Sequence, residues 1–210
     1  MCGRYSLIKE LEELFRLFGF ENLPNLAPRY NICPTQEAPI VRPNDTGGRE
    51  LVQMRWGPPG GAGRGPLINA RGETVARLPA FRDSFRARRC LVPADSFYEW
   101  RQENGIRQPF RIGMKGGKAF AFAGIWSDEG FSIVTTYANA KLAPIHERMP
   151  VILAADDYAT WLDTAKDDGR AALNLLRPFP PDEMAFYRVG PHVNSARNDD
   201  PRCITPLNAA

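Results

Sequence analysis

Short apolar segments separated by turn-forming residues run through most of the chain, and this spacing limits the folds that it can adopt. Such segments, ended by Gly, Pro, Asn or Asp, are typical of β-strands. Stretches with helical periodicity are few and do not alternate with the strands, which argues against a parallel βαβ fold. The pattern predicts an α+β fold: a single domain over residues 2–207 with a mostly antiparallel core, barrel-like or built from two sheets, and a few flanking helices.

The expected elements follow from local patterns. Leu11, Leu14, Phe15 and Phe18 share one face of a helix expected over Ile8–Phe18. Further helices are expected from Asp156, as N-cap, through Asp163, and over Arg170–Leu176, whereas Leu23–Pro43 is expected to be a loop with short extended pieces. Strands are expected over Glu50–Trp56, Arg89–Pro93, Phe97–Arg101, Phe110–Ile112, Ala119–Trp126, Phe131–Thr136, Val151–Leu153 and Met184–Val189, with a hairpin around Asp128–Gly130.

Composition narrows the functional classes. The chain has 210 residues, 43% of them hydrophobic, and no apolar run near the roughly 18 residues that span a bilayer. No secretory signal precedes the first motif, so we expect a cytoplasmic protein of a bacterium without a membrane partner. Cys2, Cys33, Cys90 and Cys203 form no C-x-x-C pair, so neither a metal site, a cofactor nor a disulfide framework is expected.

Positive charge is concentrated in one segment. The net charge is only +3, yet seven arginines lie between Arg64 and Arg89, opposed only by Glu73 and Asp83. Guanidinium groups bind phosphates through paired hydrogen bonds. The segment is therefore either a phosphate-binding surface or a solvated basic face.

The N-terminus carries the most reactive candidate residue, Cys2. Removal of Met1 would leave a free α-amine, with a pKa near ~7.7–8.0, beside a thiol on the same residue. An aldehyde can condense with the amine to an imine, and the thiol can then close a five-membered thiazolidine ring. A cysteine at this position by chance is the alternative.

Two further side chains have properties suited to proton transfer. Glu99 lies between large aromatic residues, and apolar surroundings raise the pKa of a carboxyl group. His146, in the segment Ile145–Pro150, is a candidate acid or base, whereas His192 is interpreted as structural. A surface glutamate and a structural histidine remain the alternatives for Glu99 and His146.

Seven motifs in order along nearly the whole chain resemble the SOS response-associated peptidase (SRAP) family. They are Cys2-Gly3-Arg4, Tyr30-Asn31, Arg55-Trp56-Gly57, Asn69–Thr74, Cys90–Trp100, Ile145–Pro150 and Asn198–Pro201. The resemblance implies a sensor of abasic sites in single-stranded DNA that acts as a monomer and forms a thiazolidine crosslink through its N-terminal cysteine. It also implies autoproteolytic exposure of that cysteine, lyase-type Schiff-base chemistry and association with the nucleoid when bound to DNA.

The resemblance also implies roles for individual residues. Cys2 would be the nucleophile, Asn69 would hold the Cys2 region and the sugar, Glu99 would move protons at the amine and the sugar, and His146 would act on the opened sugar. Contacts with DNA are expected from Arg4, Asn31, Trp56, Arg71, Arg77, Thr135 and Arg148. The loop Pro58–Arg64 lacks the aromatic residue common in the family, which removes one expected base-stacking contact.

Two other functions remain open. A class II glutamine amidotransferase-like hydrolase also uses an N-terminal Cys-Gly and a nearby Asn as oxyanion donor. A non-catalytic module that binds single-stranded DNA would explain the arginines and aromatic residues but would not need a free Cys2. Crosslinking to abasic DNA accounts for more of the motifs than either alternative.

Overall fold

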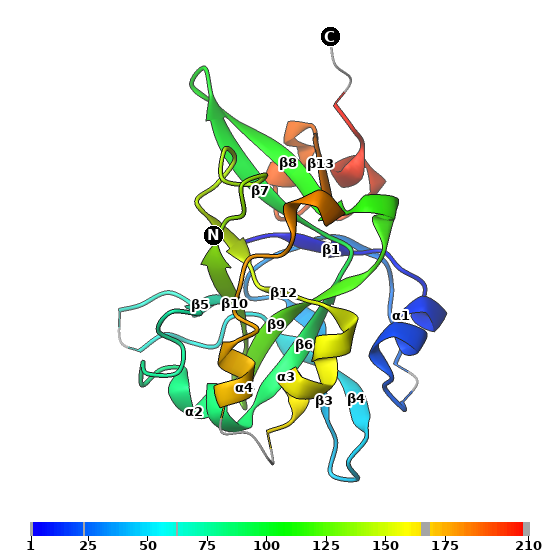
Figure 1. Cartoon of the computed structure of the whole chain (residues 1–210). Helices are drawn as coiled ribbons and strands as arrows, with labels where there is room; N and C mark the ends of the chain where they lie inside the picture. Colours follow the sequence, from blue (N-terminus) through cyan, green and yellow to red (C-terminus); the bar gives the residue numbers. More distant parts are fainter. Residues whose placement is uncertain (1, 23, 62, 165–168, 208–210) are drawn as a thin grey trace.

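Two antiparallel sheets form the body of the protein (Figure 1). The computed structural model describes residues 2–22, 24–61, 63–164 and 169–207. The first sheet has the strand order β13-β8-β7-β1-β2. In the view of Figure 1, β1 lies in the middle of the molecule, with β7, β8 and β13 above it and the strands of the second sheet below it. Its strands are β1 (Tyr5–Leu7), β2 (Arg29–Ile32), β7 (Ser96–Glu103), β8 (Ile106–Met114) and β13 (Met184–Arg188).

The second sheet has the order β11-β10-β9-β6-β3-β4, with β12 paired to β9 and β5 paired in parallel to β10. Its strands are β3 (Glu37–Pro43), β4 (Arg49–Arg55), β5 (Asn69–Arg71), β6 (Arg89–Ala94), β9 (Phe120–Ser127), β10 (Gly130–Tyr137), β11 (Arg148–Pro150) and β12 (Ile152–Leu153). The predicted α+β class with a two-sheet core is confirmed. Neither sheet closes into a barrel, because the path of paired strands in each runs from one edge strand to another.

Asp95 alone separates β6 of the second sheet from β7 of the first. Its buried carboxylate accepts hydrogen bonds from the Ser6 hydroxyl and the Ile8 amide and forms a 3.0 Å ion pair with Arg111. A buried carboxylate is tolerated when its oxygens are satisfied in this way. Asp95 therefore fixes β1, which carries the N-terminus, against both sheets.

Aromatic side chains fill the core between the sheets. Tyr5 on β1 contacts Trp56 and Phe122 edge-on, and Phe97 on β7 contacts the same Phe122 on β9. Edge-to-face pairs of this kind add stability beyond the area that they bury. These contacts join residues of both sheets in one hydrophobic cluster.

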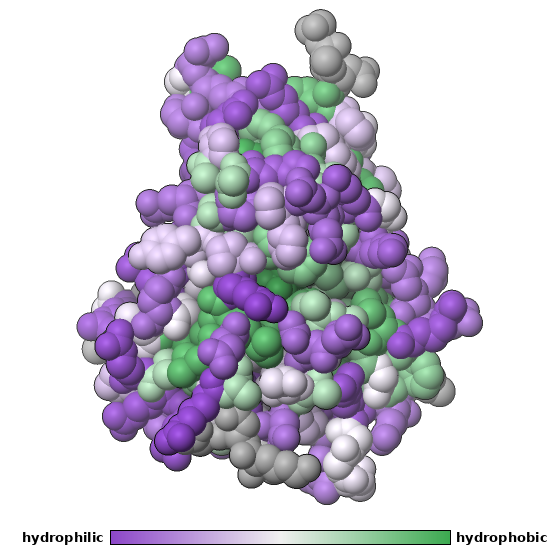
Figure 2. Space-filling model, in the orientation of Figure 1, coloured by the Kyte–Doolittle hydropathy of each residue, from purple (hydrophilic) through white to green (hydrophobic). Residues whose placement is uncertain are grey.

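Short helices lie on the outside of the sheets. They are α1 (Leu11–Phe18), α2 (Arg82–Ala87), α3 (Tyr158–Leu162) and α4 (Arg170–Leu173), with 3-10 turns η1 (Lys115–Gly117), η2 (Ala155–Asp157), η3 (Pro181–Glu183), η4 (Pro191–Asn194) and η5 (Pro201–Ile204). Among the described residues, none of these helices has the length and apolarity to cross a membrane. The face in Figure 2 is mainly hydrophilic, with apolar residues visible between the hydrophilic ones in its lower half.

The hairpin expected around Asp128–Gly130 is present, because β9 and β10 pair with Gly130 opposite Ser127. Gly130 has φ +143°, and a Cβ atom there would lie 2.4 Å from the Arg55 carbonyl oxygen. Only glycine fits such a close approach of two backbone segments. Gly130, from which the sequence predicted the hairpin, therefore also allows β10 to approach the end of β4 closely.

Three local predictions were wrong. The expected loop Leu23–Pro43 contains β2 and β3; β3 tolerates its prolines because it pairs with β6 only at Val41. Asp157 rather than Asp156 is the N-cap of α3, without a side-chain capping bond, since the 3-10 turn η2 occupies the preceding residues. The helix that begins at Arg170 ends at Leu173.

Candidate active site

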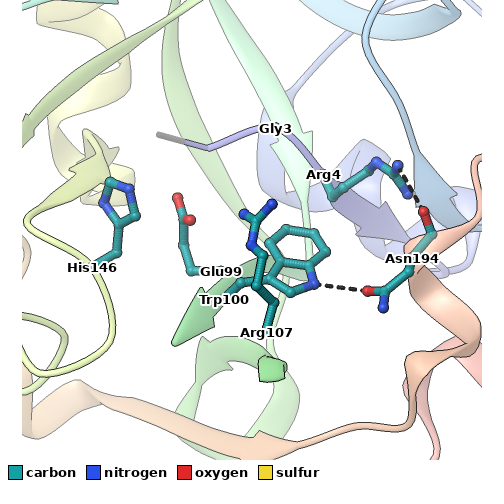
Figure 3. A pocket seen from close by; sticks show the side chains of 7 residues that line it. All are labelled: Gly3, Arg4, Glu99, Trp100, Arg107, His146 and Asn194. Carbon is teal, nitrogen blue, oxygen red and sulfur yellow. Dashed lines mark hydrogen bonds between the residues drawn. The ribbon is translucent and has the colours of Figure 1, made fainter. Parts of the chain in front are cut away.

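A pocket of about 470 Å³ lies beside the N-terminal strand (Figure 3). It lies where β7, β8, the segment before β11 and the turn η4 approach the start of β1. Its lining residues are Gly3, Arg4, Glu99, Trp100, Arg107, His146 and Asn194.

Cys2 directly precedes the pocket residue Gly3, and its backbone is held in place by Asn69. The Asn69 side-chain amide donates a 2.9 Å hydrogen bond to the Cys2 carbonyl oxygen. Asn69 itself is positioned by the pairing of β5 with β10, in which it lies opposite Ile133. The structure therefore brings together two residues that are far apart in the sequence, as the predicted roles of Cys2 and Asn69 require.

The thiol of Cys2 is fully buried. Burial raises its pKa well above the ordinary range for a thiol, and the nearby charge of Glu99 raises it further. The Cys2 sulfur lies 3.9 Å from the Arg4 carbonyl oxygen, which accepts a weak hydrogen bond from the thiol. In this state the side chain is a protonated thiol at neutral pH.

Glu99 and His146 extend into the same pocket from different elements (Figure 3). Glu99 lies on β7 and is only 4% exposed, and this burial raises the pKa of its carboxyl group above the ordinary value. The backbone N–H of Arg148 donates a 3.0 Å hydrogen bond to Nδ1 of His146. The same Nδ1 atom lies 3.2 Å from the Arg148 carbonyl oxygen. The pair offers two proton-transfer groups beside the N-terminal residues.

Arg4 faces the pocket, but its guanidinium is also bound by the protein. It donates to the Asn31 side-chain oxygen at 3.1 Å and to the carbonyl oxygens of Val193 and Asn194 at 2.8 and 3.3 Å. Arg4 thus positions the turn η4, which forms one wall of the pocket. A phosphate bound by Arg4 would have to share the guanidinium with these acceptors.

Asn31 is fully buried, and its side-chain nitrogen donates to the carbonyl oxygens of Val193, Ser195 and Asn198. The predicted contact with DNA would require this side chain to become exposed. The side chain holds the segment that follows η4, because its donors and its oxygen are already used within the protein.

Trp56 and Thr135, two further expected DNA contacts, are also fully buried. Trp56 donates from its indole nitrogen to the Ile68 carbonyl oxygen at 2.9 Å, and its ring stacks on Phe131 in the core. Thr135 accepts a 3.2 Å hydrogen bond from Arg148. Both residues support the site from inside, and direct contact with DNA would require them to become exposed.

Arg148 is buried in an ion pair. Its guanidinium donates to the two carboxylate oxygens of Glu73 at 2.8 and 3.0 Å, and to the Thr135 carbonyl oxygen at 2.8 Å. This paired geometry fixes the segment after β5 against β10. Arg71 and Arg77, by contrast, are exposed, although Arg77 also donates to the Glu73 carbonyl oxygen at 3.1 Å.

Three pocket residues were not predicted from the sequence. The Trp100 indole donates a 2.8 Å hydrogen bond to the Asn194 side-chain oxygen, and the Arg107 guanidinium lies 5.9 Å from the Trp100 ring centre. Trp100 directly follows Glu99, so its position in the motif was a usable signal. Arg107 and Asn194 had no such signal, because only the β7–β8 hairpin and the η4 turn bring them to the pocket.

Comparisons with known proteins agree on one family. The family model described as SOS response associated peptidase (SRAP) matches residues 1–196. The chain is 36% identical to the abasic site processing protein YoqW of Bacillus subtilis, over 97% of this chain and 99% of that protein, and 28% identical to the abasic site processing protein YedK of Escherichia coli, over 99% and 100%. A crystal structure of a protein from Bacteroides thetaiotaomicron superposes with a TM-score of 0.84 at 25% identity, covering 99% of this chain and 100% of that one.

Proposed function

Because the chain belongs to the SOS response associated peptidase (SRAP) family, we propose that it processes abasic sites in single-stranded DNA by forming a covalent crosslink through Cys2. The observation that carries the proposal is the position of Cys2. It immediately precedes two residues that line a pocket with Glu99 and His146, and its carbonyl is held by Asn69. This arrangement supports an N-terminal nucleophile that reacts with a small electrophile in the pocket.

The proposed reaction begins after Met1, which lies outside the described residues, has been removed. The free α-amine of Cys2 attacks the aldehyde carbon of the ring-opened sugar, and the carbinolamine loses one water to give an imine. The thiol then adds across the C=N bond: sulfur bonds to the former aldehyde carbon, and the thiol proton passes to the nitrogen. The product is a thiazolidine, and the net change is the loss of one water.

The properties of the pocket support roles for its acid–base residues. Glu99 has a raised carboxyl pKa because it is buried, so it can accept a proton from the ammonium form of the amine and return one to the leaving hydroxyl. His146, which lies next to Glu99 in Figure 3, is proposed to protonate the sugar ring oxygen during ring opening. Burial of the Cys2 thiol favours the order in which the amine reacts first and the thiol closes the ring.

The substrate is proposed to be single-stranded because the aldehyde carbon must leave the base stack to enter the pocket. The exposed guanidinium groups of Arg71 and Arg77 are proposed to bind the phosphates that flank the abasic site. The indole of Trp100, at the mouth of the pocket, offers a surface for an adjacent base.

The experiment uses a single-stranded oligonucleotide with one abasic site, followed by denaturing electrophoresis. The native chain should give a heat-stable adduct without reductant. Cys2→Ala keeps the amine, so it should give no such adduct but should be trapped by borohydride as the reduced imine. Cys33→Ala, which removes another buried thiol, is the matched control and should behave like the native chain.

Two outcomes would contradict the proposal. A stable adduct of Cys2→Ala without reductant would show that another residue is the nucleophile. Hydrolysis of free glutamine by the native chain, without any adduct on abasic DNA, would instead favour the amidohydrolase alternative. Intact-mass measurement of the active protein should show that Met1 is absent, since a retained Met1 blocks the amine.

A further inference from the structure

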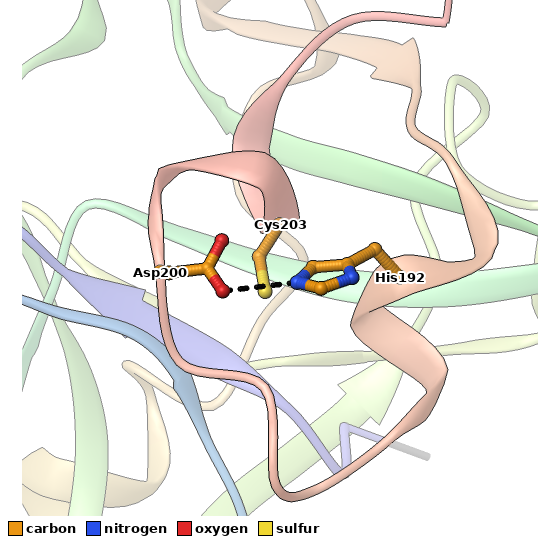
Figure 4. Close-up of side chains that lie close together, drawn as sticks. All are labelled: His192, Asp200 and Cys203. Carbon is orange, nitrogen blue, oxygen red and sulfur yellow. Dashed lines mark hydrogen bonds and ion pairs between the residues drawn. The ribbon is translucent and has the colours of Figure 1, made fainter.

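Three side chains that can bind a metal ion converge near the C-terminal end of the described chain, and none of them lines the pocket around Glu99 (Figure 4). They are His192 on η4, Asp200 at the start of η5 and Cys203 on η5. One imidazole nitrogen, one carboxylate oxygen and the thiol sulfur all lie within 4.8 Å of one another. In Figure 4 the sulfur lies beside the line that joins the His192 ring to the Asp200 carboxylate.

The geometry and the donor types fit a zinc-type ion. Nε2 of His192 is 3.0 Å from an Asp200 carboxylate oxygen. Zinc binds nitrogen and oxygen at ~2.0–2.2 Å and sulfur at ~2.3 Å, so neighbouring ligand atoms of a tetrahedral site are ~3.3–3.8 Å apart. Placing an ion between the three atoms therefore requires only small side-chain movements.

We propose that His192, Asp200 and Cys203 bind one divalent ion of the zinc class, with a water molecule as the fourth ligand. The side chains of His192 and Asp200 are 26% and 31% exposed, which gives water access to the fourth position. Cys203 is fully buried against Tyr98 and Val193, so the sulfur side of the site is apolar. A site with three protein ligands and an open position has the same composition as many zinc centres in proteins.

The backbone around the three ligands is held in place by other contacts. Asn31 binds the carbonyl oxygens on both sides of the loop between η4 and η5, and the Asp199 carboxylate accepts hydrogen bonds from the backbone N–H groups of Tyr30 and Asn31. The ligands thus project from a segment that is fixed to β2. A prearranged site loses less conformational entropy when it binds an ion.

Several hydrogen bonds have to change when the ion binds, including the weak 3.6 Å bond from the Cys203 thiol to the Asn198 carbonyl oxygen. Arg202 donates to both carboxylate oxygens of Asp200, at 3.0 and 2.8 Å, but its side chain is 74% exposed and can turn into solvent. The ring proton of His192 must move from Nε2 to Nδ1, where the Asn198 amide lies 3.1 Å away. Rotating that amide to present its oxygen to Nδ1, as a metal-bound histidine requires, gives up its 2.8 Å hydrogen bond to the His192 carbonyl oxygen.

An ion at this position would tie η4 to η5 and so stabilise one wall of the pocket. Asn194, two residues after His192, accepts a hydrogen bond from Trp100 through its side chain and one from Arg4 through its carbonyl. The proposed ion would thus act on the shape of the pocket, and the proposal does not depend on the chemistry of Cys2.

The test is titration of the chelator-treated full chain with Co²⁺, monitored by absorption. The titration uses the Cys2→Ala background, because an N-terminal aminothiol would itself bind metal. We expect one equivalent of Co²⁺ to produce the visible bands of tetrahedral cobalt together with an intense thiolate-to-cobalt band in the near ultraviolet. Zn²⁺ should then remove both signals by displacement.

Variants of the ligands decide the assignment. Cys203→Ser should abolish the thiolate band, and His192→Gln and Asp200→Asn, which change partly exposed side chains, should weaken binding at least tenfold without unfolding the chain. The matched controls Cys33→Ser and His146→Gln should bind Co²⁺ as the parent does. Titration without a thiolate band, or a band that survives in Cys203→Ser or His192→Gln, would overturn the proposal.

Arg202→Ala gives a second, independent measurement. Removing a competing cation from Asp200 should tighten Co²⁺ binding by about two- to fivefold, which corresponds to the free energy that an exposed ion pair contributes. Unchanged or weaker binding would remove Asp200 from the ligand set and overturn the three-ligand site.

With Zn²⁺ at a hundredfold excess over Kd, the melting temperature should rise by roughly 5 to 10 °C in the parent and not in Cys203→Ser.

Discussion

Asn69 donates a 2.9 Å hydrogen bond from its side-chain amide to the carbonyl oxygen of Cys2. The bond links the short parallel strand β5 to the residue that precedes the pocket. It fixes the backbone of Cys2, and therefore the direction in which its amine and thiol can approach a ligand. A reaction that depends on this orientation should be slowed when the bond is removed.

Asn69→Ala should lower the rate of crosslinking to abasic DNA by about fivefold, since one hydrogen bond contributes about 1 kcal/mol. The rate is measured by quenching at timed intervals and denaturing electrophoresis. Asn22→Ala is the matched control, because Asn22 makes similar side-chain bonds to the backbone of Leu51 on β4. An equal loss of rate in both variants would mean that Asn69 contributes only to general stability.

Glu99→Gln should raise the melting temperature at neutral pH while it slows crosslinking by ~10²–10⁴-fold, the usual contribution of a general acid or base. Burial raises the pKa of Glu99, so the ionised carboxylate destabilises the folded state at high pH. The penalty disappears as the pH falls through the raised pKa and the native group becomes protonated. The gain in melting temperature of Glu99→Gln should therefore shrink as the pH is lowered.

The control for this pH dependence is Glu129→Gln, which changes an exposed glutamate in the β9–β10 turn. Surface substitutions of this kind change the free energy of unfolding by less than ~0.5 kcal/mol. A difference between Glu99→Gln and the native chain that stays constant from acid to neutral pH would contradict the raised pKa.

Arg71→Ala and Arg4→Ala should separate phosphate binding from structural support. Arg71 is exposed, so its loss should leave the free energy of unfolding within ~0.5 kcal/mol and lower the salt dependence of binding to single-stranded DNA by about 0.7 in log–log slope. Arg4 holds η4 through two carbonyl oxygens, so its loss should also destabilise the fold by about 1–3 kcal/mol. Urea unfolding and fluorescence anisotropy at several salt concentrations measure the two effects.

Trp56→Ala should destabilise the protein by about 3–5 kcal/mol, because the indole is fully buried against Tyr5 and Phe131. Trp100→Ala is the informative comparison, since Trp100 lines the pocket and is partly exposed. It should weaken binding of single-stranded DNA by about 1–3 kcal/mol with a smaller loss of stability. Retained stability of Trp56→Ala together with weakened DNA binding would instead favour a direct contact of Trp56 with DNA.

The sequence alone determined the α+β class with a mostly antiparallel core, because the spacing of apolar segments and turn residues is a local property that sheet formation preserves. The β9–β10 hairpin is an example: its turn residue Gly130 was marked in the chain, and the strands on either side pair as expected. The strands within Leu23–Pro43 were not predicted, because their formation depends on contacts with distant segments. Its prolines argue against a strand locally, and only pairing with β4 makes β3 stable there.

The sequence also marked Cys2, Asn69, Glu99 and His146 as candidates, because their residue types and motifs carry chemical information. Their catalytic roles remain predictions, although Glu99 and His146 line one pocket and Asn69 contacts Cys2. Exposure, in contrast, could not be obtained from residue type. Arginine, asparagine and tryptophan are all residue types that contact DNA, but their identity does not show whether a given one lies on the surface or in the core.

The tertiary structure decided which of those side chains can meet a ligand. Arg148 is occupied by Glu73, and Trp56 lies in the core, because the sheets turn these positions inward. Arg107 and Asn194 reach the pocket only through a hairpin and a distant turn, and His192 approaches Cys203 only because the loop between them folds back on β2. Contacts between residues far apart in the chain depend on how whole elements pack, and local patterns in the sequence carry no record of that packing.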